Sequence, residues 1–131
     1  MAANSYEDLR VWQKAMDLVE ETYRLTADFP KNEEFGLKSQ MRRAAISVPS
    51  NIAEGQGRHY PKVFREFLYI ALGSLYELRT QLKLAERLGI VPTDNCEQAE
   101  LYCTEVGKML HRLVGSISVA RTRNQQPTTS N

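Results

Sequence analysis

The hydrophobic pattern is most regular between Pro61 and Gly89. Apolar residues recur there in alternating steps of three and four, at Phe64, Leu68, Ala71, Leu75, Leu78, Leu82 and Ala85. This spacing predicts one long amphipathic helix packed in a bundle. A second apolar strip lies to one side and consists of Tyr69, Leu72 and Tyr76, with Gly73 between them. Because one stripe fills a bundle core, the second strip predicts an oligomer interface with another copy of the chain.

Three other segments have helical spacing and are separated by short runs of turn-forming residues. The apolar stripe of the first is expected at Leu9, Trp12, Met16, Val19 and Tyr23. The expected helices cover about 8–27, 33–55, 61–88 and 94–121, after a lead at 1–7 and before a disordered tail at 122–131. No strand pattern interrupts them and the connections are short. The prediction is one all-α domain, an antiparallel up-down-up-down four-helix bundle.

The second expected helix contains a proline and ends in an acidic turn. Pro49 lacks the amide that would bond the carbonyl four residues earlier, so a kink or local break is expected there. Glu54 stands in the last turn, where the helix dipole disfavours negative charge, and Arg58 is its nearest partner. We interpret Asn51 and Glu54 as a structural network around the kink, with an acid–base or binding role as the alternative. Glu77 is expected to be a satisfied interface carboxylate.

Composition excludes several classes of protein. No apolar run approaches the ~18 residues of a membrane-spanning helix, and the N-terminus has no features of a secretory signal, so we expect a cytoplasmic protein. Cys96 and Cys103 are too far apart along a helix for a disulfide and are expected to be reduced packing residues. Neither His59 nor His111 follows a glutamate by three residues, as a di-iron bundle requires. No phosphate loop is present either, so we expect no metal, no cofactor and no enzymatic activity.

The net charge is only +1, but the basic residues are concentrated in the middle of the chain. Residues 1–30 carry three basic and six acidic groups, whereas residues 31–90 carry ten and six. The candidate nucleic-acid-binding residues are Lys38, Arg42, Arg43, Arg58, Lys62, Arg65, Arg79, Lys83 and Arg87. Singly they would form a solvated surface, and repeated around an oligomer they would attract phosphate backbones. The sequence shows no stacking platform or recognition helix, so base reading is not expected.

Three segments resemble a known family. They are Val11-Trp12-Gln13-Lys14-Ala15, the run from Arg43 to Gly55 with its Ser47-Val48-Pro49 and Asn51-Ile52-Ala53-Glu54-Gly55, and the run from Phe67 to Glu77. They resemble the four-helix-bundle family of bacterial 23S rRNA intervening-sequence proteins, and they are similar to the accessory variability determinant proteins of diversity-generating retroelements. The resemblance covers about residues 6–117.

The resemblance implies a ring, typically a homopentamer with a central channel, and no known enzymatic activity. In the retroelement branch it implies nucleic-acid binding and association with a reverse transcriptase. The family motif falls on Asn51, Glu54, Gly55, Arg58 and Glu77. Two departures are the missing capping box, whose positions hold Tyr60 and Val63, and the near-neutral charge.

Three functions follow from these patterns. The first is a non-enzymatic homo-oligomer that binds RNA or DNA through repeated basic patches. The second is a scaffold or adaptor for a protein partner such as a reverse transcriptase. The third, least favoured, is an enzyme that uses the Asn51 and Glu54 region.

Overall fold

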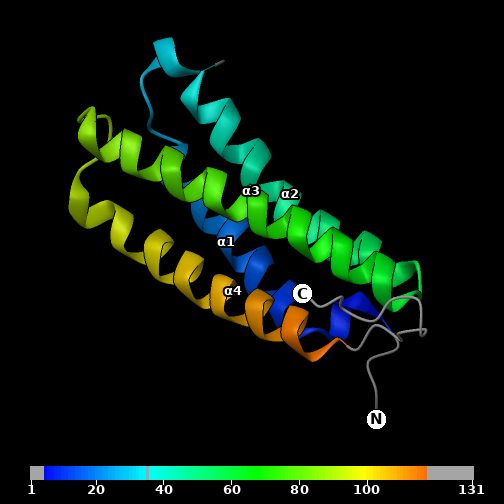
Figure 1. The fold of residues 1–131 in the computed structure, drawn as a ribbon. Helices are drawn as coiled ribbons and strands as arrows, with labels where there is room; N and C mark the ends of the chain where they lie inside the picture. The colour runs from blue at the N-terminus through cyan, green and yellow to red at the C-terminus, as the bar shows by residue number, and fades with distance from the viewer. Residues whose placement is uncertain (1–4, 35, 118–131) are drawn as a thin grey trace, which may run out of the picture.

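The computed structural model describes residues 5–34 and 36–117, and within them the chain is entirely helical, with four α-helices and no strand (Figure 1). The helices are α1 (Arg10–Thr26), α2 (Leu37–Gly57), α3 (Pro61–Arg87) and α4 (Glu97–Ser116). Short 3-10 turns precede α1, α2 and α4, at Tyr6–Asp8, Lys31–Glu33 and Thr93–Cys96. The expected all-α class with four helices is confirmed. No helix of the described part is long and apolar enough to cross a membrane.

Each helix packs chiefly against two neighbours, and the core lies between all four. α3 contacts α2 and α4, and α1 contacts the same two helices. In Figure 1, α3 and α4 run side by side with α1 behind them. The core stripe predicted for α3 is confirmed, because Leu68, Leu75 and Leu82 are at most 2% exposed and Phe64 packs partly buried against the core.

The helix ends differ by a few residues from the expected ones. α2 begins at Leu37 rather than near residue 33, because Lys31–Glu33 forms a separate 3-10 turn. The Glu33 carboxylate accepts a hydrogen bond from the Leu37 amide at 3.1 Å, which satisfies one free donor at the start of α2. α4 ends at Ser116, and Ile117 is extended. Residues 118–121 of the expected fourth helix, the expected tail and residues 1–4 lie outside the described residues.

Of the kink or local break expected at Pro49, the local break is wrong. α2 is continuous from Leu37 to Gly57, with Pro49 buried inside it. A proline inside a helix costs about 3 kcal/mol. Val48 and Ile52, both fully buried, lie on either side of it. We attribute the continuity to the burial of these two side chains, which offsets the lost hydrogen bond.

The stripe predicted for α1 is confirmed only in part, because Leu9, Trp12 and Val19 pack partly buried against the core. The buried positions are Val11, Ala15, Leu18, Glu21, Thr22 and Thr26, whereas Met16 and Tyr23 are more than one-third exposed. Two faces of α1 have helical spacing, and the face that looks more polar is the one in the core. The two threonine hydroxyls donate to helix carbonyls at 2.8 and 2.7 Å, so their burial leaves no hydroxyl proton unpaired. Met16 and Tyr23 therefore lie outside the core, and Trp12 and Val19 lie at its margin.

The second apolar strip predicted for α3 is only partly exposed. Leu72 is only 4% exposed and belongs to the core of its own chain, so its assignment to an interface with another copy is corrected. Tyr69 and Tyr76 are each 53% exposed. The strip is therefore two separate exposed rings with a buried leucine between them.

This division predicts that two truncations destabilise the protein by different amounts. Leu72→Ala leaves a cavity in the core and is expected to lower the free energy of unfolding by about 2–5 kcal/mol. Tyr76→Ala removes a half-exposed ring and is expected to cost about 1 kcal/mol or less. Urea unfolding followed by circular dichroism measures both. Equal losses for the two variants would contradict the placement of Leu72.

Candidate nucleic-acid interface

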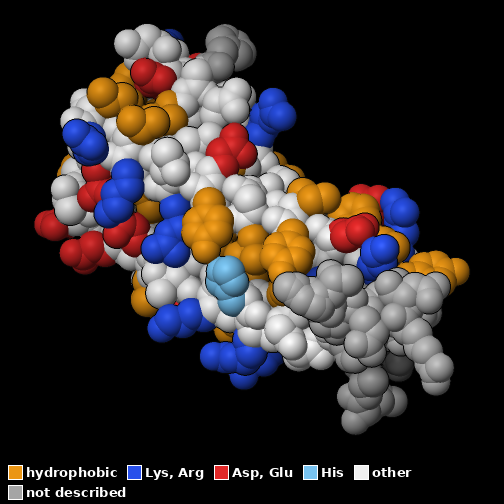
Figure 2. Space-filling model, viewed as in Figure 1, with side chains coloured by type: hydrophobic (Ala, Val, Ile, Leu, Met, Phe, Trp, Pro, Cys, Tyr) orange, Lys and Arg blue, Asp and Glu red, His pale blue; other side chains and the backbone are white. Residues whose placement is uncertain are grey.

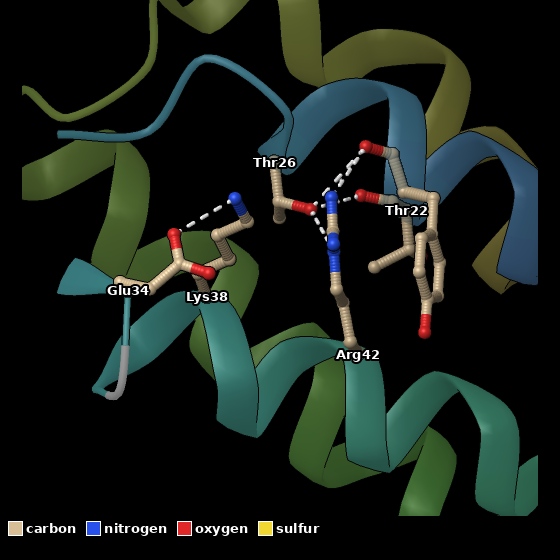
Figure 3. Close-up of polar contacts among 6 residues, drawn as sticks. Thr22, Thr26, Glu34, Lys38 and Arg42 are labelled. Atoms are coloured by element: carbon tan, nitrogen blue, oxygen red, sulfur yellow. Dashed lines mark hydrogen bonds and ion pairs between the residues drawn. The ribbon is translucent and has the colours of Figure 1, made fainter. Parts of the chain in front are cut away.

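Arg42 connects α2 to α1 (Figure 3). Its Nε donates to the Thr26 hydroxyl at 2.8 Å and its terminal nitrogen donates to the Tyr23 carbonyl at 3.1 Å. The guanidinium also lies over the Tyr23 ring, 4.1 Å from the centroid. Lys38, one turn earlier, pairs with Glu34 at 3.1 Å, and its side chain is only 14% exposed. Both cations are engaged within the chain, so we leave them out of the candidate surface.

The motif around Asn51 joins α2 to α3. The Asn51 amide donates to the Ser47 carbonyl at 2.8 Å and to the Ser47 hydroxyl at 2.9 Å. That hydroxyl is in turn 2.8 Å from the Ser74 hydroxyl on α3. Gly55 allows close packing nearby, because a Cβ there would lie 2.6 Å from the Phe67 Cβ. These contacts give the motif a role in holding two helices together.

The expected pairing of Glu54 with Arg58 is confirmed. The Arg58 guanidinium donates to the Glu54 carboxylate at 2.6 Å, and both side chains are more than half exposed. Arg58 also lies over the Phe67 ring at 5.3 Å. Glu77 is exposed and accepts a long hydrogen bond from Gln81 at 3.4 Å. Neither carboxylate has the buried, converging surroundings that tune an acid or base.

The basic residues of α3 lie on one side of this helix. We define the α3 stripe as Lys62, Arg65, Tyr69, Tyr76, Arg79, Lys83 and Arg87. Their steps of three, four and seven place them on a common face. From the first to the last they span roughly 38 Å of helix. Among the described residues, Lys62, Arg79 and Arg87 have no acidic partner within ion-pair distance.

The remaining two cations of the stripe have neighbours. Lys83 pairs with Glu100 of α4 at 3.1 Å and lies 3.7 Å from Glu86. The hydrogen bond to Glu100 raises the pKa of Lys83 above its ordinary value. Arg65 lies over the Tyr69 ring, 5.9 Å from its centroid. Lys83 therefore adds less free charge to the stripe than Arg79.

α4 adds an imidazole to the middle of the stripe. The Tyr76 hydroxyl and His111 Nε2 are hydrogen-bonded at 3.0 Å, with ring centroids 6.4 Å apart. Beside Tyr76, a groove of about 250 Å³ runs between the two helices towards Arg79 and Lys83. Figure 2 shows hydrophobic side chains beside a histidine on this face, with basic side chains on both sides of them. The structure thus assembles an aromatic cluster among cations that the sequence analysis did not expect.

Cys103 lines the same groove but has no nucleophilic character. It is buried and free, and burial raises its pKa to about 11, so the thiol stays protonated at neutral pH. Cys96 is also buried and free, with a pKa of about 11 for the same reason. In the part of the chain that the structure describes, no three His, Cys, Asp or Glu side chains come together as a metal site. The chemistry of this face is therefore cationic and aromatic.

The two neighbouring arginines of α2 predict different outcomes. Arg42→Ala breaks the contacts to Thr26 and Tyr23, and it is expected to lower the free energy of unfolding by about 1–3 kcal/mol. Arg43→Ala removes the same charge from an exposed position and is expected to stay within about 0.5 kcal/mol of the unmodified chain. Thermal unfolding measures the difference. Equal stability of the two variants would show that the Arg42 contacts contribute nothing.

Comparison with known proteins finds a similar structure and a matching family model. A similar structure is that of a protein of unknown function from the S23 ribosomal protein family of Bacteroides thetaiotaomicron VPI-5482, with a TM-score of 0.72 and 23% identity. The match covers 81% of this chain and 99% of that one, and at this identity it shows the fold alone. A search of curated proteins found no match. The family model described as 23S rRNA-intervening sequence protein matches residues 7–112, and this chain therefore belongs to that family.

Proposed function

We propose that this chain is a non-enzymatic, homo-oligomeric, antiparallel four-helix bundle that binds nucleic acid through the α3 stripe. The observation that carries the proposal is the gathering of five cations and two half-exposed tyrosines on one side of a single helix. Clustered cations suffice for sequence-independent binding of phosphate backbones, because binding releases condensed counterions. Four of those cations, Lys62, Arg65, Arg79 and Arg87, have no acidic partner among the described residues, so their charge is available to phosphates.

The proposal depends on where the charge lies rather than on how much there is. The whole chain has a net charge of +1, which gives little general attraction to a polyanion. A row of cations along one rigid helix still produces a local positive potential. Arginine is also suited to this contact, since its planar guanidinium can donate two parallel hydrogen bonds to one phosphate.

We also propose that copies of the chain associate through a second surface, the α1–α2 seam. This groove of about 300 Å³ is lined by Tyr6, Trp12, Met16, Val19, Ile46, Pro49, Ser50 and Ala53. Met16 is 37% exposed and Ile46 41%, and apolar patches of this kind mark protein contacts. The seam replaces the interface expected at Tyr69 and Tyr76, and it leaves the α3 stripe free.

The assembly that we propose is a closed ring. A closed ring joins two different patches on each copy, and the seam can serve as one of them. The family resemblance supports a ring and implies five copies. The seam also suits a different protein partner, which is the scaffold or adaptor alternative. A reverse transcriptase is the partner that the likeness to retroelement proteins suggests for that alternative.

Binding through the stripe is tested with two charge-matched triple variants. Lys62→Gln/Arg79→Gln/Arg87→Gln removes three cations of the stripe, and Arg10→Gln/Lys31→Gln/Arg43→Gln removes three from elsewhere. The stripe variant is expected to bind mixed oligonucleotides at least about tenfold more weakly at low salt. The slope of log K against log salt is expected to fall by about 2 or more. Fluorescence anisotropy measures both quantities.

The control variant decides how this result is interpreted. It loses the same net charge, so equal weakening in both triples would mean that net charge matters and that the stripe is not a site. No binding by the unmodified chain at low salt would contradict the proposal altogether.

The α1–α2 seam is tested by light scattering. Met16→Glu and Ile46→Glu place a charge in the seam at exposed positions, and each is expected to reduce the oligomer to monomers without loss of helicity. Leu101→Glu changes a similarly exposed apolar residue of α4 and is expected to keep the oligomer. A monomeric unmodified chain would refute self-association and would favour a different protein as the occupant of the seam.

A further inference from the structure

We infer that the α3 stripe takes single-stranded nucleic acid, with bases stacked on Tyr69 and Tyr76 above Gly73. This inference rests on the proposed function, because it names the class of nucleic acid that the same surface binds. It goes further by assigning the two tyrosines and the glycine to the bases and the arginines to the phosphates.

The first observation is that the packing of the chain does not require a glycine at position 73. Gly73 lies in the middle of α3, where glycine is unfavourable relative to alanine. Among the other helical glycines, packing requires Gly55, where a Cβ would lie 2.6 Å from Phe67, and a Cβ at Gly107 would touch Leu75 at 3.4 Å. Gly57 and Gly115 lie at or next to the ends of α2 and α4. A Cβ at Gly73 would meet no described atom within 4 Å. The open space lets an external group approach the helix backbone.

The two tyrosines lie on either side of the open space at Gly73. Tyr69 precedes Gly73 by one turn and Tyr76 follows it by one turn, so all three share a face of α3. Each ring is 53% exposed, and Leu72 beneath them is buried. We call this open space at Gly73, with an exposed tyrosine one turn away on either side, the notch. A planar, apolar group of the size of a nucleobase fits this description.

The rings are held before any ligand arrives. The hydrogen bond between the Tyr76 hydroxyl and His111 Nε2, at 3.0 Å, holds one ring against α4. The Arg65 guanidinium lies over the other ring, 5.9 Å from its centroid. Stacking on a ring that is already oriented loses less side-chain entropy than stacking on a free one.

The charges around the notch indicate which flat group it accepts. Arg79 follows Tyr76 by three residues and lines the groove beside it, and Arg65 precedes Tyr69. A ligand that stacks in the notch therefore meets cations on both sides, which fits a base whose neighbouring phosphates are negative. A duplex hides the faces of its bases, so it can use the cations but not the rings. Single strands are thus expected to bind more tightly than duplexes.

The test compares an unstructured single strand of about 15 thymidines, its uridine counterpart and a duplex of the same length, by fluorescence anisotropy at low salt. The unmodified chain is expected to prefer both single strands to the duplex. Tyr69→Leu and Tyr76→Leu are each expected to weaken single-strand binding about tenfold and to leave duplex binding unchanged. Tyr76→Phe keeps the aromatic face but loses the hydrogen bond to His111, so it is expected to weaken single-strand binding much less than Tyr76→Leu. Tyr60→Leu changes a tyrosine outside the stripe, 68% exposed, and serves as the matched control.

A second variant fills the notch without removing a ring. Gly73→Leu places a side chain where a Cβ meets no described atom, so the melting temperature is expected to stay the same or rise. Single-strand binding is nevertheless expected to weaken. A more stable protein with weaker binding is an outcome that a purely structural role of Gly73 would not produce.

Three results would overturn the inference. The first is single-strand binding unaffected by both tyrosine variants, or weakened together with duplex binding to the same degree. The second is a loss of oligomer mass in the tyrosine variants by light scattering, which would assign the notch to another copy of the chain. The third is a duplex bound as tightly as the single strands. If the triple cation variant still weakens binding in these cases, the stripe remains a phosphate-binding surface and only the stacking role falls.

Discussion

The burial of one face of α3 determines the rest of this structure. Three leucines of this face are at most 2% exposed in the core between the helices, namely Leu68, Leu75 and Leu82. Their burial fixes how α3 is rotated about its axis. Because side chains at steps of three and four share a face, this rotation also decides what the opposite sides of the helix present. One margin of α3 meets α2 through Ser74 and Phe67. The other margin meets α4 and carries the basic and aromatic stripe.

The sequence was most informative where a single interpretation of the pattern was possible. α3 has one unbroken leucine stripe, and its core residues and its bounds were predicted closely. α1 has two candidate faces, and the choice between them depended on whether Thr22 and Thr26 could be buried. Their hydroxyls bond back to the helix carbonyls, which a scale of residue hydrophobicity does not register. Leu72 was misplaced because a residue at the margin of a stripe turns inward or outward depending on neighbouring helices.

In the candidate site, too, contacts within one helix were predictable from the sequence and contacts between helices were not. The pair of Glu54 and Arg58 was predictable, since residues four apart on a helix are neighbours. Arg42 bonds Thr26, sixteen residues away, and Tyr76 bonds His111, thirty-five residues away. No spacing rule within one helix reveals such contacts. They remove one cation from the expected surface and add an aromatic cluster to it. The seven-residue spacing of Tyr69 and Tyr76, with cations beyond each, was the signal available in the sequence.

The two proposed surfaces lie on different helices. The α1–α2 seam is apolar, and the α3 stripe is cationic and aromatic, so the proposed association and the proposed nucleic-acid binding need not compete. The most direct test of this account is an amide chemical-shift map of the full-length chain titrated with a short single strand. The largest shifts are expected along the stripe from Lys62 to Arg87 and at His111. Shifts concentrated around Trp12 and Ile46, or around Arg42, would contradict this account.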